Sequence, residues 1–121
     1  MNFNFEDLNY LYIGLLKSCE LGLVEIEQSE ETNYHRIEMT RMDWILCNAE
    51  RITNAFAIRF SQAKNYWGTL SHFGIFDALE KGRLLAVGNL QQKTEINENH
   101  IIEFGPGRMT IDLNVFELGA I

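Results

Sequence analysis

The chain has 121 residues, of which 46% are hydrophobic. This is long enough for one domain with a buried core, and we expect residues 1–121 to form a single domain. The net charge of −7 disfavours nucleic acid as a partner, because binding to phosphates depends on clustered Lys and Arg. No apolar run approaches the ~18 residues of a membrane span, and the first residues lack the basic and apolar regions of a signal peptide. We therefore expect no membrane insertion and no signal peptide.

The N-terminal quarter of the chain has the composition of strands. Residues 5–9 are too few for more than one helical turn. Residues 10–16 (YLYIGLL) are rich in strand formers, and the alternative of an amphipathic helix is disfavoured by Gly14 in the middle. We expect a turn or loop at 17–20 and a short edge segment at 21–26.

The middle of the chain continues in short elements. Residues 34–40 alternate in polarity, which predicts a half-buried strand. Residues 42–49 predict another short strand or an apolar bend, and Thr53-Asn54 predicts a turn. Residues 55–60 are again strand-like, and a polar loop is expected at 61–66.

The clearest element is a β-hairpin between residues 67 and 90. Two apolar runs of strand length, 67–78 and 83–90, flank a short polar connection that ends in Gly82. Neither face of the first run is wholly polar, so we expect a central pair of strands covered on much of both sides. Gly74 and Gly88 lie within the strands, where glycine often marks a bulge or a close backbone contact.

The C-terminal part predicts two more strands. A short strand at 101–104 is followed by Gly105-Pro106-Gly107, a strong turn signal, and by a strand at 108–114 with one polar face. The apolar residues 115–121 either dock on the domain or contact a partner. Seven or eight short strands with no long helical pattern predict an all-β fold, an antiparallel, jelly-roll-like β-sandwich.

Few side chains have the spacing of a metal-binding or catalytic motif. The three histidines do not form a metal-ligand motif, and the acidic stretch 25–31 lacks the glycine of a calcium loop, so we favour a solvated loop there. A triad of His72, Asp77 and a serine is disfavoured because no G-x-S-x-G motif is present, and because the two residues fall on opposite faces of a strand. We expect His72 to be hydrogen-bonded within the sheet and Asp77 to bind turn amides.

Cys19 and Cys47 could form a disulfide, but free, mostly buried thiols are favoured. We expect a non-enzyme without cofactor or metal.

Three segments carry a resemblance to a known family. They are TNAFAIRF at 53–60, WGTLSHFGIFDA at 67–78 and GRLLAVGNL at 82–90. Together with KTEI at 93–96 and MTIDL at 109–113, they resemble small virion proteins of tailed bacteriophages, usually labelled phage tail fibre or minor tail proteins. The sequence departs from the family at Lys81, where a Gly pair is usual, and at Asn97-Glu98, which replaces a Gly.

The resemblance implies a non-enzymatic virion structural protein, associated with the tail or tail fibre, that assembles through protein–protein contacts. The expected partners are other phage virion proteins and further copies of the chain, in virions assembled in the host bacterial cytoplasm. The alternatives are a receptor- or carbohydrate-binding tip module that contacts the host surface, and a head decoration protein. The expected interface residues are aromatic or in the apolar tail: Tyr66, Trp67, Val115, Phe116 and Leu118. For Trp67 a place in the core is an equal alternative.

Overall fold

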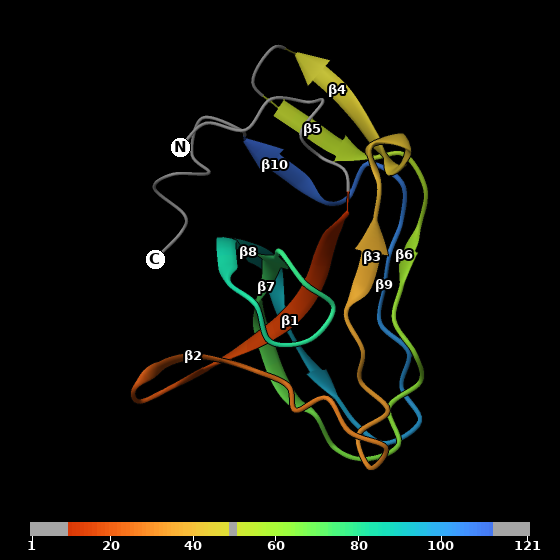
Figure 1. Ribbon diagram of the computed structural model, residues 1–121. Helices are drawn as coiled ribbons and strands as arrows, with labels where there is room; N and C mark the ends of the chain where they lie inside the picture. The colour runs from red at the N-terminus through yellow and green to blue at the C-terminus, as the bar shows by residue number, and fades with distance from the viewer. Residues whose placement is uncertain (1–9, 49–50, 113–121) are drawn as a thin grey trace.

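The computed structural model describes residues 10–48 and 51–112, and these form an all-β protein (Figure 1). Every strand pairing is antiparallel, as the sequence predicts. The strands in this part of the chain are β1 (Leu11–Cys19), β2 (Gly22–Glu25), β3 (Ile37–Met39), β4 (Trp44–Asn48), β5 (Arg51–Asn54), β6 (Ile58–Arg59), β7 (Gly68–Phe76), β8 (Leu84–Ile96), β9 (Glu103–Phe104) and β10 (Thr110–Asp112). One 3-10 helix, η2 (Arg41–Asp43), precedes β4. The described residues thus contain ten strands, more than the seven or eight predicted.

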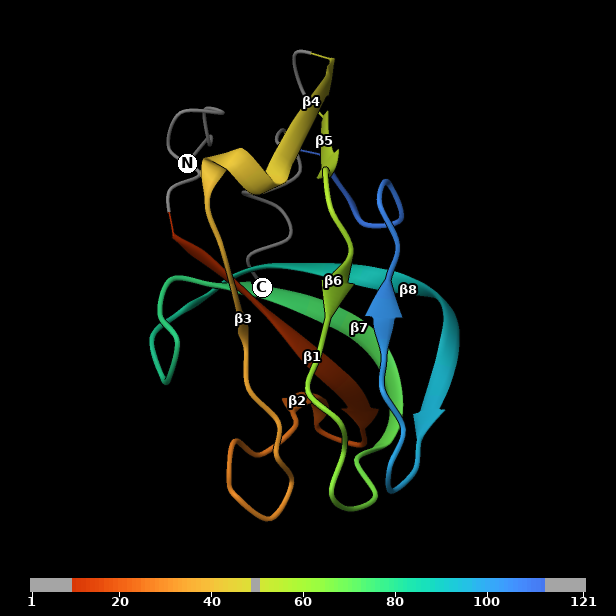
Figure 2. The ribbon, with the colours of Figure 1, turned by 90° about the vertical axis from the view of Figure 1, so that its right-hand side faces the viewer.

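The strands form two layers. One is a sheet in the order β2-β1-β7-β8, with β3 paired to β1 beside this path. In front of it, β3, β6 and β9 run side by side, and the sheet β10-β5-β4 lies at one end (Figure 2). This is the predicted sandwich.

The predicted hairpin is present as β7 and β8. Its turn is closed by Asp77, whose Oδ1 accepts a hydrogen bond of 2.7 Å from the Arg83 amide. Lys81 and Gly82 have φ values of 55° and 67°, which glycine adopts without strain. The predicted role of Asp77 in binding turn amides is confirmed.

The hairpin is only half central. β7 lies between β1 and β8, whereas β8 is the last of the described strands in the sheet, so the prediction of a central pair was wrong for β8. β8 also extends to Ile96, six residues beyond the predicted end. Polar residues such as Gln91 and Lys93 can continue a strand there because an edge strand exposes them to water.

Several other boundaries differ from prediction. β1 runs on through the expected loop at 17–20 as far as Cys19, because its partner β2 pairs with residues 16–19. The expected turn at Thr53-Asn54 is the end of β5, and the expected strand at 55–60 is reduced to β6. The thiols of Cys19 and Cys47 are free, as predicted, but exposed rather than buried.

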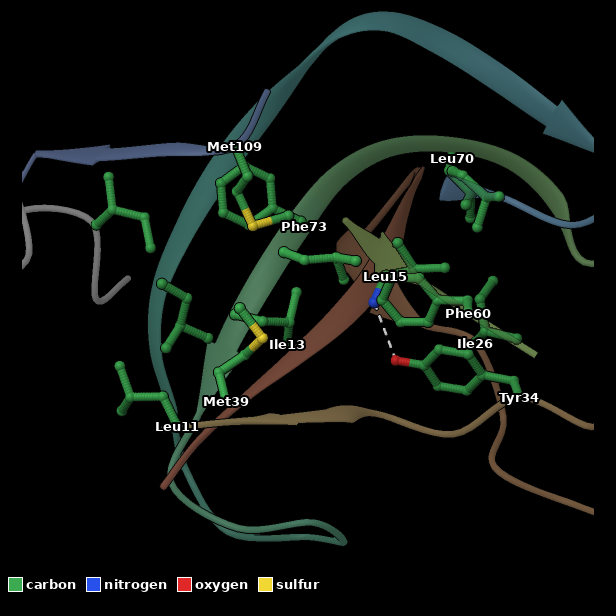
Figure 3. Close-up of a cluster of buried hydrophobic side chains, with 14 of the residues drawn as sticks. Leu11, Ile13, Leu15, Ile26, Tyr34, Met39, Phe60, Leu70, Phe73 and Met109 are labelled. Carbon is green, nitrogen blue, oxygen red and sulfur yellow. Dashed lines mark hydrogen bonds between the residues drawn. The ribbon is translucent and has the colours of Figure 1, made fainter. Parts of the chain in front are cut away.

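The core lies between the two layers (Figure 3). β1 contributes Ile13 and Leu15, both fully buried, and the opposite layer contributes Phe60. Tyr34 is also fully buried, and its hydroxyl accepts a hydrogen bond of 2.9 Å from the Leu15 amide, drawn as a dashed line. Of the predicted strand at 34–40, only Ile37–Met39 is a strand, β3. The side chains of Tyr34 and Arg36, which precede it, are both buried.

Candidate interaction surfaces

The predicted interface residues have different environments. Tyr66 is 57% exposed, and its hydroxyl donates a 2.9 Å hydrogen bond to Glu95, which raises the pKa of the tyrosine. Trp67 is only 1% exposed and its Nε1 donates to the Thr32 carbonyl oxygen at 2.8 Å, so it follows the core alternative. Val115, Phe116 and Leu118 lie outside the described residues.

A buried ion pair fixes the rim of the sandwich. The Arg36 guanidinium makes two 2.8 Å hydrogen bonds to the two carboxylate oxygens of Glu25 and two more to the carbonyl oxygens of Ala78 and Lys81 in the β7–β8 turn. It also stacks on Phe76, 3.6 Å from the ring centroid. Burial lowers the pKa of Arg36, but hydrogen bonding to Glu25 and its charge outweigh this, so the net shift is upward. The network joins the segment after β2 to the hairpin turn.

Tyr34 completes this network. Its hydroxyl donates to Glu25 at 2.6 Å, and burial together with the neighbouring carboxylate raises its pKa. The prediction placed Glu25 in a solvated acidic loop and was wrong for this residue. The pairing joins residues 11 apart through a fold-back, which no local pattern in the sequence indicates.

The tip of the β1–β2 hairpin is an exposed apolar surface. Leu21 is 99% exposed, Leu23 38% and Val24 45%. The hairpin projects from the body of the molecule (Figure 1), and β2 is an edge strand paired only with β1 among the described strands. An edge strand with exposed apolar side chains is a surface on which another chain can pair. We call this surface, residues 21–24, the hairpin tip.

A groove of about 700 Å³ lies between β8 and β9. It faces β9 and the segments around it, and its lining combines apolar and polar side chains. The lining residues are Phe73, Asn89, Leu90, Gln91, Gln92, Thr94, Glu95, Ile96, His100, Ile101, Ile102, Glu103, Phe104, Arg108 and Met109. We call it the β8 groove. The sequence analysis did not predict this groove, because β8 and the segment around β9 form its walls without pairing as a hairpin.

A bend in β8 shapes the groove. Leu70 of β7 pairs with Thr94 and His72 pairs with Asn89, so residues 90–93 of β8 stand opposite Ser71 alone. Extra residues on one strand bend it and leave part of its backbone outside the ladder. The bend brings three amide side chains, at positions 89, 91 and 92, to the groove wall.

The polar groups of the β8 groove fall into two sets. Glu95 is bonded to Tyr66, and Glu103 forms a 3.6 Å ion pair with Arg59. Four polar side chains that line the groove have no hydrogen-bond or ionic partner among residues 10–48 and 51–112. They are those of Asn89, Gln91, Gln92 and Arg108. These groups are available to a ligand.

His72, in strand β7, is held by a hydrogen bond to a neighbouring side chain. His72 Nδ1 lies 2.7 Å from the Ser71 hydroxyl, which in turn lies 2.8 Å from the hydroxyl of Ser18. The prediction of a histidine hydrogen-bonded within the sheet is confirmed. In the described part of the chain, no group of three or more His, Cys, Asp and Glu is placed to hold a metal ion. No helix among those residues is long and apolar enough to cross a membrane.

A β-sandwich with an exposed edge hairpin and an open groove is typical of proteins that act through surface contacts. The family profile described as podophage GP4 fiber I protein gp80 matches residues 5–112, and the chain belongs to this family of phage fibre proteins. The resemblance to phage tail fibre proteins is thus confirmed. No curated protein matches the chain.

Proposed function

We propose that the chain is a non-enzymatic structural subunit of a bacteriophage virion that assembles into or onto a fibre of the tail. The family match over residues 5–112 is the observation that carries this proposal. Residues 1–121 act as a single building domain, made in the host cytoplasm and incorporated into the particle. Its partners are other virion proteins and further copies of itself, because repeated parts of such particles are usually symmetric oligomers.

The hairpin tip is the contact surface that the structure supports best. Burying the side chain of Leu21 against a partner stabilises the contact by about 1.5–3 kcal/mol, before the cost of association. Leu23 and Val24 are 38% and 45% exposed, so each adds less than about half of this. Tyr66 is a second candidate contact, exposed on the loop before β7. Residues 115, 116 and 118 remain part of the proposed interface.

The mass of the purified protein in solution tests self-assembly. Light scattering after size-exclusion chromatography is expected to show oligomers whose fraction rises with protein concentration. The double substitution Leu21→Ser and Val24→Ser is expected to shift the population toward monomer. Leu79→Ser is the matched control, because Leu79 is 49% exposed in a different turn. A wild type that stays monomeric at every concentration, or an equal effect of the control, contradicts the use of the hairpin tip.

The position in the particle tests the rest of the proposal. Cryo-electron microscopy of the intact virion is expected to show density that fits this sandwich in a tail fibre or at its attachment. Density on the capsid surface would instead identify a head decoration protein and overturn the fibre assignment. A receptor-binding tip module would need exposed aromatic side chains, and the ring of Trp67 is buried, which disfavours this alternative.

A further inference from the structure

The face of the sheet β10-β5-β4 that meets the core is open at β4. Leu46 stands opposite Ile52, and Ile52 stands opposite Ile111, so the three side chains lie on one face of this sheet. Ile52 and Ile111 are 0% and 6% exposed and belong to the core, whereas Leu46 is 46% exposed. β4 pairs only with β5 among the described strands and lies at the outer end of the molecule (Figure 1). The described residues therefore leave the core uncovered along this edge.

A buried donor without an acceptor lies at the same place. Trp44 is two residues before Leu46 on β4, so the two side chains share one face of the strand. Trp44 is 4% exposed, and its Nε1 has no hydrogen-bond partner among the described residues. A buried donor without an acceptor costs about 1–3 kcal/mol, and nearly all such donors in native proteins are paired. The unpartnered indole indicates that a further segment packs here.

We propose that residues 1–9 of the same chain pack along β4 and supply the acceptor for Trp44. This inference goes beyond the assembly role and does not depend on it. The segment reads MNFNFEDLN, with apolar side chains at positions 1, 3 and 5 and Asn between them, which is typical of a strand with one apolar face. A strand of residues 1–5 matches the five residues of β4 and places alternate apolar side chains beside Leu46. The side chains of the segment that can accept a hydrogen bond are those of Asn2, Asn4, Glu6, Asp7 and Asn9.

The described chain enters the fold next to Trp44. β1 pairs Leu11 with Met39, and both residues belong to the same buried cluster as Trp44. Only one residue and the three residues of η2, which rise about 6 Å, separate Met39 from Trp44. Residues 6–9 span up to about 13 Å when extended, so residues 1–5 can reach β4 without any change in the described fold.

Two other occupants are less well placed. Residues 113–121 follow β10, which lies on the side of β5 away from β4, so they begin at the opposite edge of this sheet. A second copy could pair with β4, whose Ile45 is 52% exposed, because an uncovered apolar edge accepts other strands. A segment of the same chain competes well with it, since a short tether gives an effective concentration of about millimolar. With β4 closed by residues 1–9, the hairpin tip is the edge left for neighbouring subunits.

The test is two-dimensional NMR of the isotope-labelled full chain, in which the two tryptophans give two indole N–H signals. NOEs are expected between the Trp44 indole and side chains of residues 1–9. The double substitution Phe3→Ser and Phe5→Ser is expected to shift the Trp44 signal and to speed its hydrogen exchange about tenfold, the loss of roughly one buried hydrogen bond. The Trp67 signal is expected to stay unchanged, because the Thr32 carbonyl oxygen accepts its hydrogen bond.

Phe116→Ser makes the same change in residues 113–121 and is the matched control, expected to leave both indole signals unchanged. An equal effect of this control, or NOEs from Trp44 to residues 113–121, overturns the proposal in favour of the C-terminal residues. Intermolecular NOEs to Trp44 in a mixture of labelled and unlabelled chains overturn it in favour of a second copy.

Water as the acceptor gives a third result. The Trp44 indole then shows no NOEs to residues 1–9, and its exchange is the same in the wild type and in the double variant, which overturns the proposal. A wild type that stays monomeric and still shows these NOEs separates failure of the assembly proposal from failure of this one.

Discussion

Replacing Glu25 with Gln tests the buried ion pair at the rim of the sandwich. The side chain of Arg36 is 4% exposed and that of Glu25 is 19% exposed. Removing one partner of a buried pair costs about 3–5 kcal/mol, because the other charge is left without compensation. The variant keeps one oxygen acceptor and the site is partly hydrated, so we expect the free energy of unfolding to fall by about 2–3 kcal/mol. For a domain of this size the Tm falls by roughly 10 °C.

Urea unfolding followed by tryptophan fluorescence measures this loss, since Trp67 is buried in contact with Tyr34, with ring centroids 5.6 Å apart. Glu20→Gln makes the same chemical change on an exposed residue of the same hairpin and is expected to cost less than about 0.5 kcal/mol. The Arg36→Met substitution is expected to lower the free energy of unfolding by about 2 kcal/mol less in the Glu25→Gln variant than in the wild type. Equal costs for Glu25→Gln and Glu20→Gln, or strict additivity in the double variant, would refute the reasoning.

Three further substitutions test other parts of the fold. Tyr34→Phe leaves the buried amide of Leu15 without its acceptor and is expected to cost about 2 kcal/mol in urea unfolding, whereas a cost near zero would show that water replaces the hydroxyl. Gly88→Ala places a Cβ against the ring of Phe73 and is expected to cost about 1–3 kcal/mol by the same assay; an unchanged urea midpoint would contradict this close approach. Hydrogen bonds from the turn backbone hold the pKa of Asp77 below its ordinary value. Because the folded-state pKa is the lower one, this stabilisation is present above pH ~4 and is lost as the pH falls through the folded-state pKa. The urea midpoint of the wild type is therefore expected to fall more steeply below pH ~4 than that of Asp77→Asn, and parallel profiles would contradict this.

The sequence by itself determined the features that depend on neighbouring residues. Alternation of apolar side chains, the polar connection ending in Gly82 and the Gly105-Pro106-Gly107 turn were sufficient to predict the β7–β8 hairpin and an antiparallel all-β fold. The role of Asp77 was predictable for the same reason, since its partner lies six residues away in the same turn. The family was recognisable because its motif is continuous over 67–90.

Only the tertiary structure decided which surfaces are available for binding. The burial of Trp67, the pairing of Arg36 with Glu25 and the edge position of β8 all depend on how separate segments fold against one another, and not on adjacent residues. Period-2 alternation gives the face of a residue within its strand, but not which strand lies next to it. The β8 groove is the clearest case, because β8 and β9 form its walls without pairing with each other, and no local pattern records that they meet.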